Sequence, residues 1–172
     1  MMIRKFAKDR KGLAAIEFAF VAGALCISVL NVSDLAIYIF DDMQVKNAAE
    51  MGAQAAWAAC DLNHVPVTIR CAGYTNKVTQ AVQSTSLATG VALQTGSPQE
   101  GFYCVNSAGG LQYVADPYNP PSDCTAAGTP ANQPGDYIKV QTTYTFTSLF
   151  PGISVASALP ATMTSTAWMK LS

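Results

Sequence analysis

A single carboxylate near the start of a long apolar stretch is the feature of this sequence best able to do chemistry. The apolar run Leu13–Phe40 is 28 residues long and contains two formal charges, Glu17 and Asp34. A carboxylate in hydrocarbon costs about 3 kcal/mol even on lenient insertion scales, so it needs a partner, water or a proton. Cleavage after Gly12 would provide a partner, because Leu13 would gain a free α-amino group and Glu17 would become the fifth residue of the mature chain. A neighbouring subunit could then present that amine to the carboxylate.

The residues before this run are basic and set its direction in a membrane. Five of the ten basic residues lie in the first 11 positions, against the single acid Asp9. A spanning helix needs about 20 mostly apolar residues, so residues 13–33 can cross a bilayer. The positive-inside rule then keeps the basic head in the cytoplasm and exports the bulk of the chain. In the alternative interpretation, Glu17 reaches the cytoplasmic headgroup region by itself.

The helix is predicted to continue beyond the membrane. No proline occurs between Leu13 and Pro66, and alanine is abundant from residue 41 to 60, which favours helix. A helix over residues 13–61 would be about 74 Å long, so only its first half fits in a bilayer. A bend is plausible at Gly23 or Gly52, because glycine weakens a helix. Small apolar residues share one face of the second half: Val45, Ala48, Ala49, Gly52, Ala55, Ala56 and Ala59. This face suits docking onto the chain's own domain or onto neighbouring helices in a filament.

Residues 62–172 are predicted to form a small exported α+β domain. Periodicity indicates a short helix over 74–87, a short strand around 91–93 and a hairpin of strands over 102–106 and 111–115. Residues 116–136 contain five of the nine prolines, so the region 89–136 is expected to be rich in loops. Alternating residues predict the strongest strand over 137–146, and the segment 162–171 closes the domain. The expected fold class is therefore α+β: a long N-terminal helix with a small antiparallel sheet packed on its C-terminal half.

Four of the five cysteines fall in the part of the chain expected to be exported. Cys26 lies inside the apolar run and is most simply an apolar filler. Cys60, Cys71, Cys104 and Cys124 allow three pairings. The pairs Cys60–Cys71 and Cys104–Cys124 are favoured because they close short loops, of about 10 and 20 residues. Such a disulfide contributes roughly 3 kcal/mol and forms in an oxidising compartment such as the periplasm.

Metal binding and catalysis find little support in the sequence. Cys60, His64 and Cys71 could be imagined as zinc ligands, but their spacing matches no standard pattern. Asp116 and Asp123 lie in the proline-rich loop and are interpreted as turn formers, with a calcium site as the alternative. No nucleophile elbow, P-loop or His-Glu-x-x-His motif occurs. We therefore expect a protein that is not an enzyme and that uses no cofactor or metal.

The residues around Gly12 resemble the cleavage and assembly signature of type IV pilins and pseudopilins. That pattern is a Gly, four mostly apolar residues and a Glu, often followed by Phe; here residues 12–18 read Gly-Leu-Ala-Ala-Ile-Glu-Phe. The stretch 10–21 is similar to TadE-type minor pseudopilins of tight-adherence (Flp) pili, as is the alanine-rich stretch 45–56. The C-terminal segments 144–153 and 162–169 are similar in kind to the C-terminal segments of TadE-like proteins. Ala22-Gly23 stand where many relatives have proline, and Leu13 stands where major pilins often have Phe, so the match does not separate TadE from TadF.

The resemblance implies a role, a location and a set of partners. Residues 1–12 would be a prepilin leader, removed by prepilin peptidase between Gly12 and Leu13, and Glu17 would be the assembly contact. The expected product is a minor pseudopilin in the bacterial inner membrane, a single-pass protein with its N-terminus cytoplasmic and its C-terminal domain periplasmic. It would assemble or prime a pilus used in surface attachment. The expected partners are other pilin and pseudopilin subunits, the inner-membrane pilus assembly platform and the lipid bilayer.

Alternative interpretations of the N-terminus and of the function stay open. A conventional signal peptide has an apolar core of about 7–15 residues and an Ala-x-Ala site, which fit poorly here, and an uncleaved anchor is a further option. The exported region could be a binding module, such as a pilus-tip adhesin acting through residues 89–136, or a membrane-anchored periplasmic protein or enzyme. Residues 13–172 carry five basic and ten acidic residues, so we expect no nucleic-acid partner.

Overall fold

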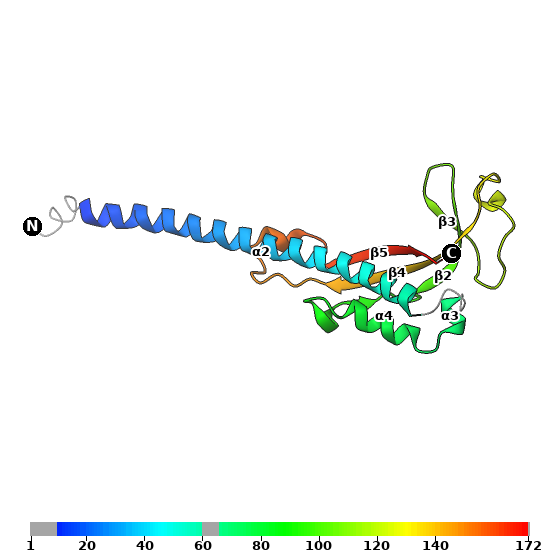
Figure 1. Cartoon of the computed structure of the whole chain (residues 1–172). Helices are drawn as coiled ribbons and strands as arrows, with labels where there is room; N and C mark the ends of the chain where they lie inside the picture. Colours follow the sequence, from blue (N-terminus) through cyan, green and yellow to red (C-terminus); the bar gives the residue numbers. More distant parts are fainter. Residues whose placement is uncertain (1–9, 60–65, 172) are drawn as a thin grey trace, which may run out of the picture. The chain divides into compact units, whose positions relative to one another are not determined.

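A computed structural model describes residues 10–59 and 66–171 of the chain (Figure 1). Its α+β architecture consists of a long N-terminal helix and a five-stranded antiparallel sheet, as expected from the sequence. The α-helices are α2 (Arg10–Ala58), α3 (Val67–Arg70) and α4 (Tyr74–Val82). The strands are β1 (Ala92–Leu93), β2 (Gln99–Val105), β3 (Leu111–Ala115), β4 (Gly135–Thr145) and β5 (Thr162–Lys170). Three short 3₁₀ helices are η2 (Ala88–Gly90), η3 (Thr125–Ala127) and η4 (Val155–Ala158).

The chain divides into two compact units. The first contains residues up to Phe40 together with Thr147–Ala161, which is the connection between β4 and β5. The second contains Asp41–Phe146 and Thr162–Ser172, and so includes the last part of α2 and all five strands. Helix α2 therefore contributes its two parts to two different units. The predicted division into leader, exported domain and membrane helix concerns processing and compartment, and stays a prediction.

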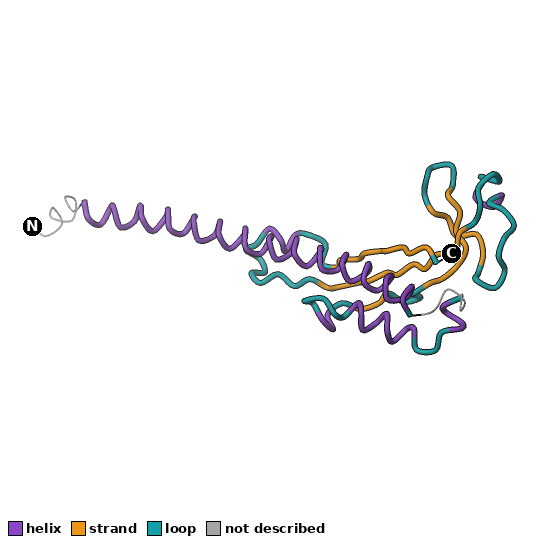
Figure 2. The backbone as a smooth tube through the Cα atoms, viewed as in Figure 1, coloured by secondary structure: helices purple, strands orange, loops and turns teal. Residues whose placement is uncertain are grey.

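Strand β4 is the centre of the sheet in the second unit (Figure 2). It pairs with β5 over residues 137–145, with β2 over residues 135–139 and with β1 at residues 142 and 143, and β3 extends the sheet from β2. Alternate residues of β4 face the core, and Ile138, Val140 and Thr142 are fully buried there. The predicted alternation is confirmed, because successive side chains of a strand point to opposite faces.

The second part of α2 packs on this core through small residues. Val45, Ala48, Ala49 and Ala56 are fully buried. A side-chain contact also joins the layers, since Thr142 Oγ1 donates a hydrogen bond of 3.1 Å to the carbonyl oxygen of Val45. For these residues the structure selects one of the two interpretations of the small-residue face, namely docking onto the chain's own domain.

Gly52 allows the closest approach between α2 and its neighbours. A Cβ atom placed there would lie 2.8 Å from Cγ2 of Val82 on α4 and 3.0 Å from Cγ1 of Val140 on β4. The helix continues through this residue without interruption. The sequence suggested a bend at Gly52, whereas the structure shows a packing role, because the missing side chain makes room for two β-branched residues.

Helix α4 and strand β2 show clear differences from their predicted extents. Helix α4 begins at the predicted Tyr74 but ends at Val82 rather than at residue 87. The residues that follow favour turns, and Ser84 Oγ donates a 2.6 Å hydrogen bond to the carbonyl of Ala81, offering the backbone an alternative to further helix. Strand β2 begins three residues before the predicted 102, at Gln99, because it pairs with β4 over residues 99–103.

We predict that Gly52→Val destabilises the second unit by about 1–3 kcal/mol, because the new methyl groups would overlap Val82 and Val140. The matched control is Gly23→Val on the same helix, where a Cβ atom would meet nothing within 4 Å. Urea unfolding of the detergent-solubilised chain, followed by tryptophan fluorescence, measures both variants. Equal midpoints for the two variants would contradict the packing role.

Candidate functional site

The first part of α2 exposes apolar side chains on all sides. Among the described residues up to Val32, eight large hydrophobic residues each expose more than half of their surface: Ile16, Phe18, Phe20, Val21, Leu25, Ile27, Val29 and Val32. The helix is long and apolar enough to cross a membrane, its most apolar window has a mean hydropathy of 2.0, and none of that window is buried within the chain. A helix that is apolar all round requires cover from lipid or from other helices.

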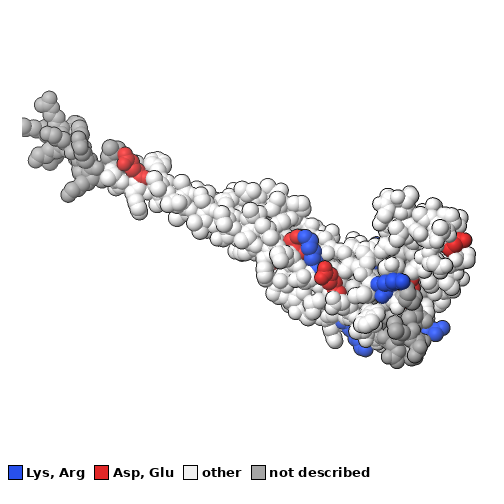
Figure 3. Space-filling view, turned by 45° about the horizontal axis from the view of Figure 1, so that its top comes forward, with Lys and Arg blue, Asp and Glu red and all other residues white. Residues whose placement is uncertain are grey.

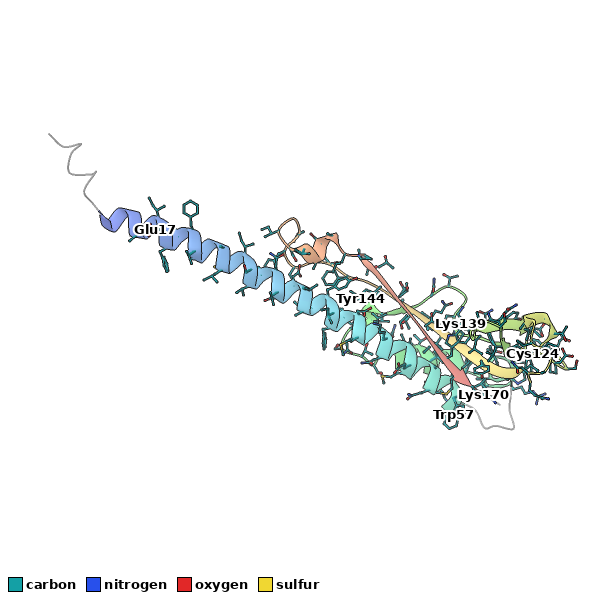
Figure 4. The ribbon with its side chains drawn as sticks, turned by 90° about the horizontal axis from the view of Figure 1, so that it is seen from above. Glu17, Trp57, Cys124, Lys139, Tyr144 and Lys170 are labelled. Carbon is teal, nitrogen blue, oxygen red and sulfur yellow. A yellow bond between two sulfur atoms is a disulfide. The ribbon has the colours of Figure 1, made fainter. Side chains whose placement is uncertain are left out.

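Glu17 is the charged residue of this apolar surface. It is exposed, and no hydrogen bond or ion pair within the described part of the chain involves it. Figure 4 shows it near the start of α2, and on the face drawn in Figure 3 the first part of α2 is white apart from one acidic patch near its beginning. Glu17 therefore has no partner among the residues that the structure describes.

Gly12 and Leu13 lie one turn before Glu17, within α2. Gly12 is exposed, and a Cβ atom added to it would meet nothing within 4 Å. The structure thus places the three predicted site residues on consecutive turns of a single helix. A side chain added at Gly12 would therefore disturb no packing among the described residues.

Asp34 is a buried carboxylate at the far end of the apolar stretch. Its exposed fraction is 0%. It accepts hydrogen bonds from Ser148 Oγ at 2.6 Å and from the backbone N–H of Leu149 at 3.0 Å, and the side chain of Ser154 donates a further one. Through these hydrogen bonds Asp34 holds the segment Thr147–Ala161, which we call the connecting segment.

Two further side chains of α2 hold the same segment. Asn31 Oδ1 accepts a 2.8 Å hydrogen bond from the backbone N–H of Val155, and the hydroxyl of Tyr38 donates a 3.3 Å bond to the carbonyl of Pro160. Asn31, Asp34 and Tyr38 follow the i, i+3, i+7 spacing of one helix face, and we call them the polar stripe. Figure 1 shows the connecting segment alongside α2 within the first unit.

Two of the acidic side chains buried in the second unit are Glu100 and Asp136. Glu100 on β2 accepts hydrogen bonds from the backbone N–H groups of Val67 at 2.8 Å and Thr68 at 2.7 Å, and thus caps the first turn of α3. Asp136 on β4 is 1% exposed, and its Oδ1 has no hydrogen-bond partner among the described residues. Burial, and then the nearby charge of Glu100, raise the pKa of Asp136 to about 6. The sequence analysis singled out neither acid, although the alternation of β4 places residue 136 on the buried face.

Two of the described cysteines have a structural role. Cys104 and Cys124 form a disulfide with a Cα–Cα distance of 5.6 Å, in agreement with the favoured pairing. Cys26 is free and exposed. Cys60 and His64 lie outside the described residues, and with them the Cys60–Cys71 pairing and the zinc alternative.

The loop acids are turn formers, as predicted. Asp116 Oδ1 accepts hydrogen bonds from the N–H groups of Tyr118 at 2.9 Å and Asn119 at 3.1 Å, and Asp123 Oδ1 accepts one of 2.9 Å from Thr125. The described residues contain no cluster of three or more His, Cys, Asp or Glu that could hold a metal ion.

A groove in the second unit runs between α2 and β5. It is lined on α2 by Lys46, Glu50, Ala53 and Gln54 and on β5 by residues 165–169. Its lining combines apolar and neutral polar groups with one basic and one acidic side chain.

We predict that Asp34→Ala releases the connecting segment from α2, because Ser148 Oγ and the Leu149 N–H would lose their shared acceptor. Exchange of the Leu149 amide hydrogen should accelerate about tenfold or more. The matched control is Asp42→Ala on the same helix, whose carboxylate is partly exposed and pairs with Lys46 at 2.6 Å. Unchanged exchange at Leu149 in the Asp34 variant would show that the polar stripe does not hold the segment.

A second prediction concerns pH. Because the pKa of Asp136 is raised from 3.8 to about 6 in the folded state, the folded chain retains a proton that the unfolded chain releases over this range. Stability should therefore fall as pH rises from about 4 to 6. Asp136→Asn should flatten this dependence and raise stability at pH 7 by about 1–3 kcal/mol.

The melting temperature measured between pH 4 and pH 8 tests this effect. Asp123→Asn is the control, because hydrogen bonds from Thr125 lower the pKa of that carboxyl, and the substitution should leave the loss of stability between pH 4 and 6 in place. A pH profile of Asp136→Asn parallel to that of the unmodified chain would refute the assignment.

Gly12, Leu13 and Glu17 lie close together near the start of α2, in the part of the helix whose large apolar side chains are exposed. This arrangement is the main evidence for function. Comparison of the chain with protein-family models, with curated proteins and with solved structures finds no match.

Proposed function

We propose that the chain is a minor pseudopilin that takes part in assembling or priming a tight-adherence type IV pilus used in surface attachment. The observation that carries the proposal is the lone exposed carboxylate of Glu17, five residues after Gly12, on a helix whose apolar surface is not buried by the rest of the chain. A core helix of a globular protein would bury such a surface. This one is available for lipid before assembly and for other helices afterwards.

Cleavage creates the partner that Glu17 lacks. Prepilin peptidase would cut between Gly12 and Leu13 on the cytoplasmic side of the inner membrane, leaving the helix attached with a free α-amine at Leu13. In hydrocarbon an amine and a carboxylate are each costly when unpaired. A neighbouring subunit that brings its amine to Glu17 neutralises both charges, and this requirement fixes the relative register of the two helices.

Helix packing would supply the remaining interaction. The partners are other pilin and pseudopilin subunits, assembled by the inner-membrane platform. Phe18, Phe20 and their neighbours would pass from lipid contacts to contacts with adjacent helices. The second unit stays in the periplasm, where an oxidising environment supports the Cys104–Cys124 disulfide.

A pilus-tip or membrane-anchored adhesin is the second candidate. The observation that favours it is the disulfide-held loop between β3 and β4, which exposes 69% of Tyr118. Deleting residues 117–122 leaves both cysteines and all strands in place. Pili that form but no longer attach would favour this candidate, and normal attachment would exclude an adhesive role for these residues.

We predict that Gly12→Val blocks cleavage, so that the precursor keeps residues 1–12. Because an added Cβ at Gly12 meets nothing within 4 Å, a loss of cleavage would reflect recognition and not misfolding. Intact-mass spectrometry of the membrane fraction distinguishes the two forms, and Gly23→Val, which should be cleaved normally, is the control. An intact N-terminus of the unmodified protein in cells with an active peptidase would exclude the pseudopilin role.

We also predict that Glu17→Ala abolishes assembly but leaves membrane insertion and cleavage largely intact, because it removes only the acceptor for the amine. Pilus number by electron microscopy and cleavage by mass spectrometry are measured together. Glu50→Ala is the control, since Glu50 is also an exposed carboxylate of α2 but lies in its second part. Normal pilus numbers in the Glu17 variant would refute the pairing role.

A further inference from the structure

We propose that the connecting segment, Thr147–Ala161, inserts into the surface of the lipid bilayer at the periplasmic end of the spanning helix. The apolar tip formed by Leu149, Ile153 and Val155 would lie at the boundary between headgroups and acyl chains. The inference rests on the membrane-spanning part of the proposed function. It adds a second membrane contact to the chain, made by a segment far from α2 in the sequence.

The composition of the segment suits lipid better than water. Residues 147–161 contain no charged side chain, and no charged residue occurs between Lys139 and Lys170. Surface loops of soluble domains normally carry polar and charged residues. Because it has no ionisable group, the connecting segment pays no charge penalty on entering an apolar environment.

Three large apolar side chains of the segment also face outward, whereas a loop in water normally exposes polar side chains. Leu149, Ile153 and Val155 expose 61%, 59% and 64% of their surface. Ser154, by contrast, is 5% exposed and faces inward, where it donates to the buried carboxylate of Asp34. The hydroxyl of Ser154 therefore lies inside while three large apolar side chains lie outside, as expected for a surface that contacts lipid.

Most backbone donors of the segment are satisfied internally. The N–H groups of Ile153 and Ser154 donate to the carbonyl of Phe150 at 3.2 and 3.0 Å, and those of Ser157 and Leu159 donate within η4. Those of Leu149 and Val155 donate to the polar stripe. The prolines at positions 151 and 160 have no N–H to satisfy. A segment with its donors paired in this way can leave water at low cost.

The position along α2 places the segment at the membrane boundary. Ala14 and Asp34 are separated by 20 residues, which correspond to about 30 Å of helix at 1.5 Å per residue. This equals the thickness of the hydrocarbon core, about 30 Å. When Ala14 enters the bilayer at the cytoplasmic boundary, the polar stripe lies at the opposite boundary.

The first unit thus presents one continuous apolar surface. It consists of the exposed side chains of α2 up to Val32 and the apolar tip of the connecting segment, which is attached at the adjoining turns of the helix. We assign lipid as the occupant because this surface continues that of the spanning helix. The segment covers Asp34, so this carboxylate is hydrogen-bonded where the helix reaches the boundary of the hydrocarbon core.

Tryptophan quenching by brominated lipids tests the insertion. The full-length chain carrying Trp57→Phe and Trp168→Phe is reconstituted in phosphatidylcholine vesicles with Ile153→Trp as its single tryptophan. Lipids brominated near the headgroup end of the acyl chains should strongly quench its emission. Val155→Trp is a second position, because the backbone hydrogen bond of Val155 does not depend on its side chain.

Two matched proteins make the result decisive. Phe20→Trp in the same background reports on the spanning helix, and the Trp57→Phe protein retains Trp168 of β5 as a tryptophan outside the membrane. Quenching at position 20 without quenching at 153 and 155 would overturn the inference and leave the spanning helix intact. Absence of quenching at all three positions would overturn both. Blue-shifted but unquenched emission at 153 would show cover by protein and would also refute the proposal.

Discussion

The cost of taking a carboxylate out of water organises the first part of α2. Asp34 meets this cost within the chain, because Ser148, Leu149 and Ser154 donate hydrogen bonds to it and the connecting segment covers it. Glu17 has no such arrangement within the described residues. The same helix therefore carries one carboxylate that is hydrogen-bonded and one that has no partner among the described residues. This difference is why Glu17, and not Asp34, is the better candidate for an assembly contact.

One continuous helix serves two kinds of packing because its two parts carry different side chains. Large residues such as Phe18 and Phe20 surround the first part and find no partner in the chain. Alanine and glycine line one face of the second part, so β4 and α4 approach closely at Gly52. Small residues give a close and specific contact, whereas large ones on all sides give a surface suited to lipid or to helices of other subunits.

Residue spacing was sufficient to predict those elements whose structure depends mainly on the local sequence. The alternation of β4, the β2–β3 hairpin and the small-residue face of α2 could all be recognised from residue spacing. The end of α4 was missed because the serines and threonine after Val82 compete for backbone hydrogen bonds. The role of Asp34 could not be predicted, since Ser148 lies 114 residues away in a segment without periodicity. Asp136 could have been recognised from the sequence as a carboxylate on the inward face of a strand. Only the structure shows that its Oδ1 has no hydrogen-bond partner among the described residues.

Under the proposed function, the distribution of charge also determines which surfaces would supply the free energy of assembly. Residues 13–172 carry twice as many acidic as basic side chains, so the exported surfaces of two copies repel each other, within the range allowed by salt. Apolar burial contributes about 25 cal/mol per Å², independent of charge, and the first part of α2 offers the largest continuous surface of this kind. Attraction between subunits is therefore concentrated in the helix. The exported domain is left free to vary in its loops, provided that the contact between Glu17 and the neighbouring amine is kept.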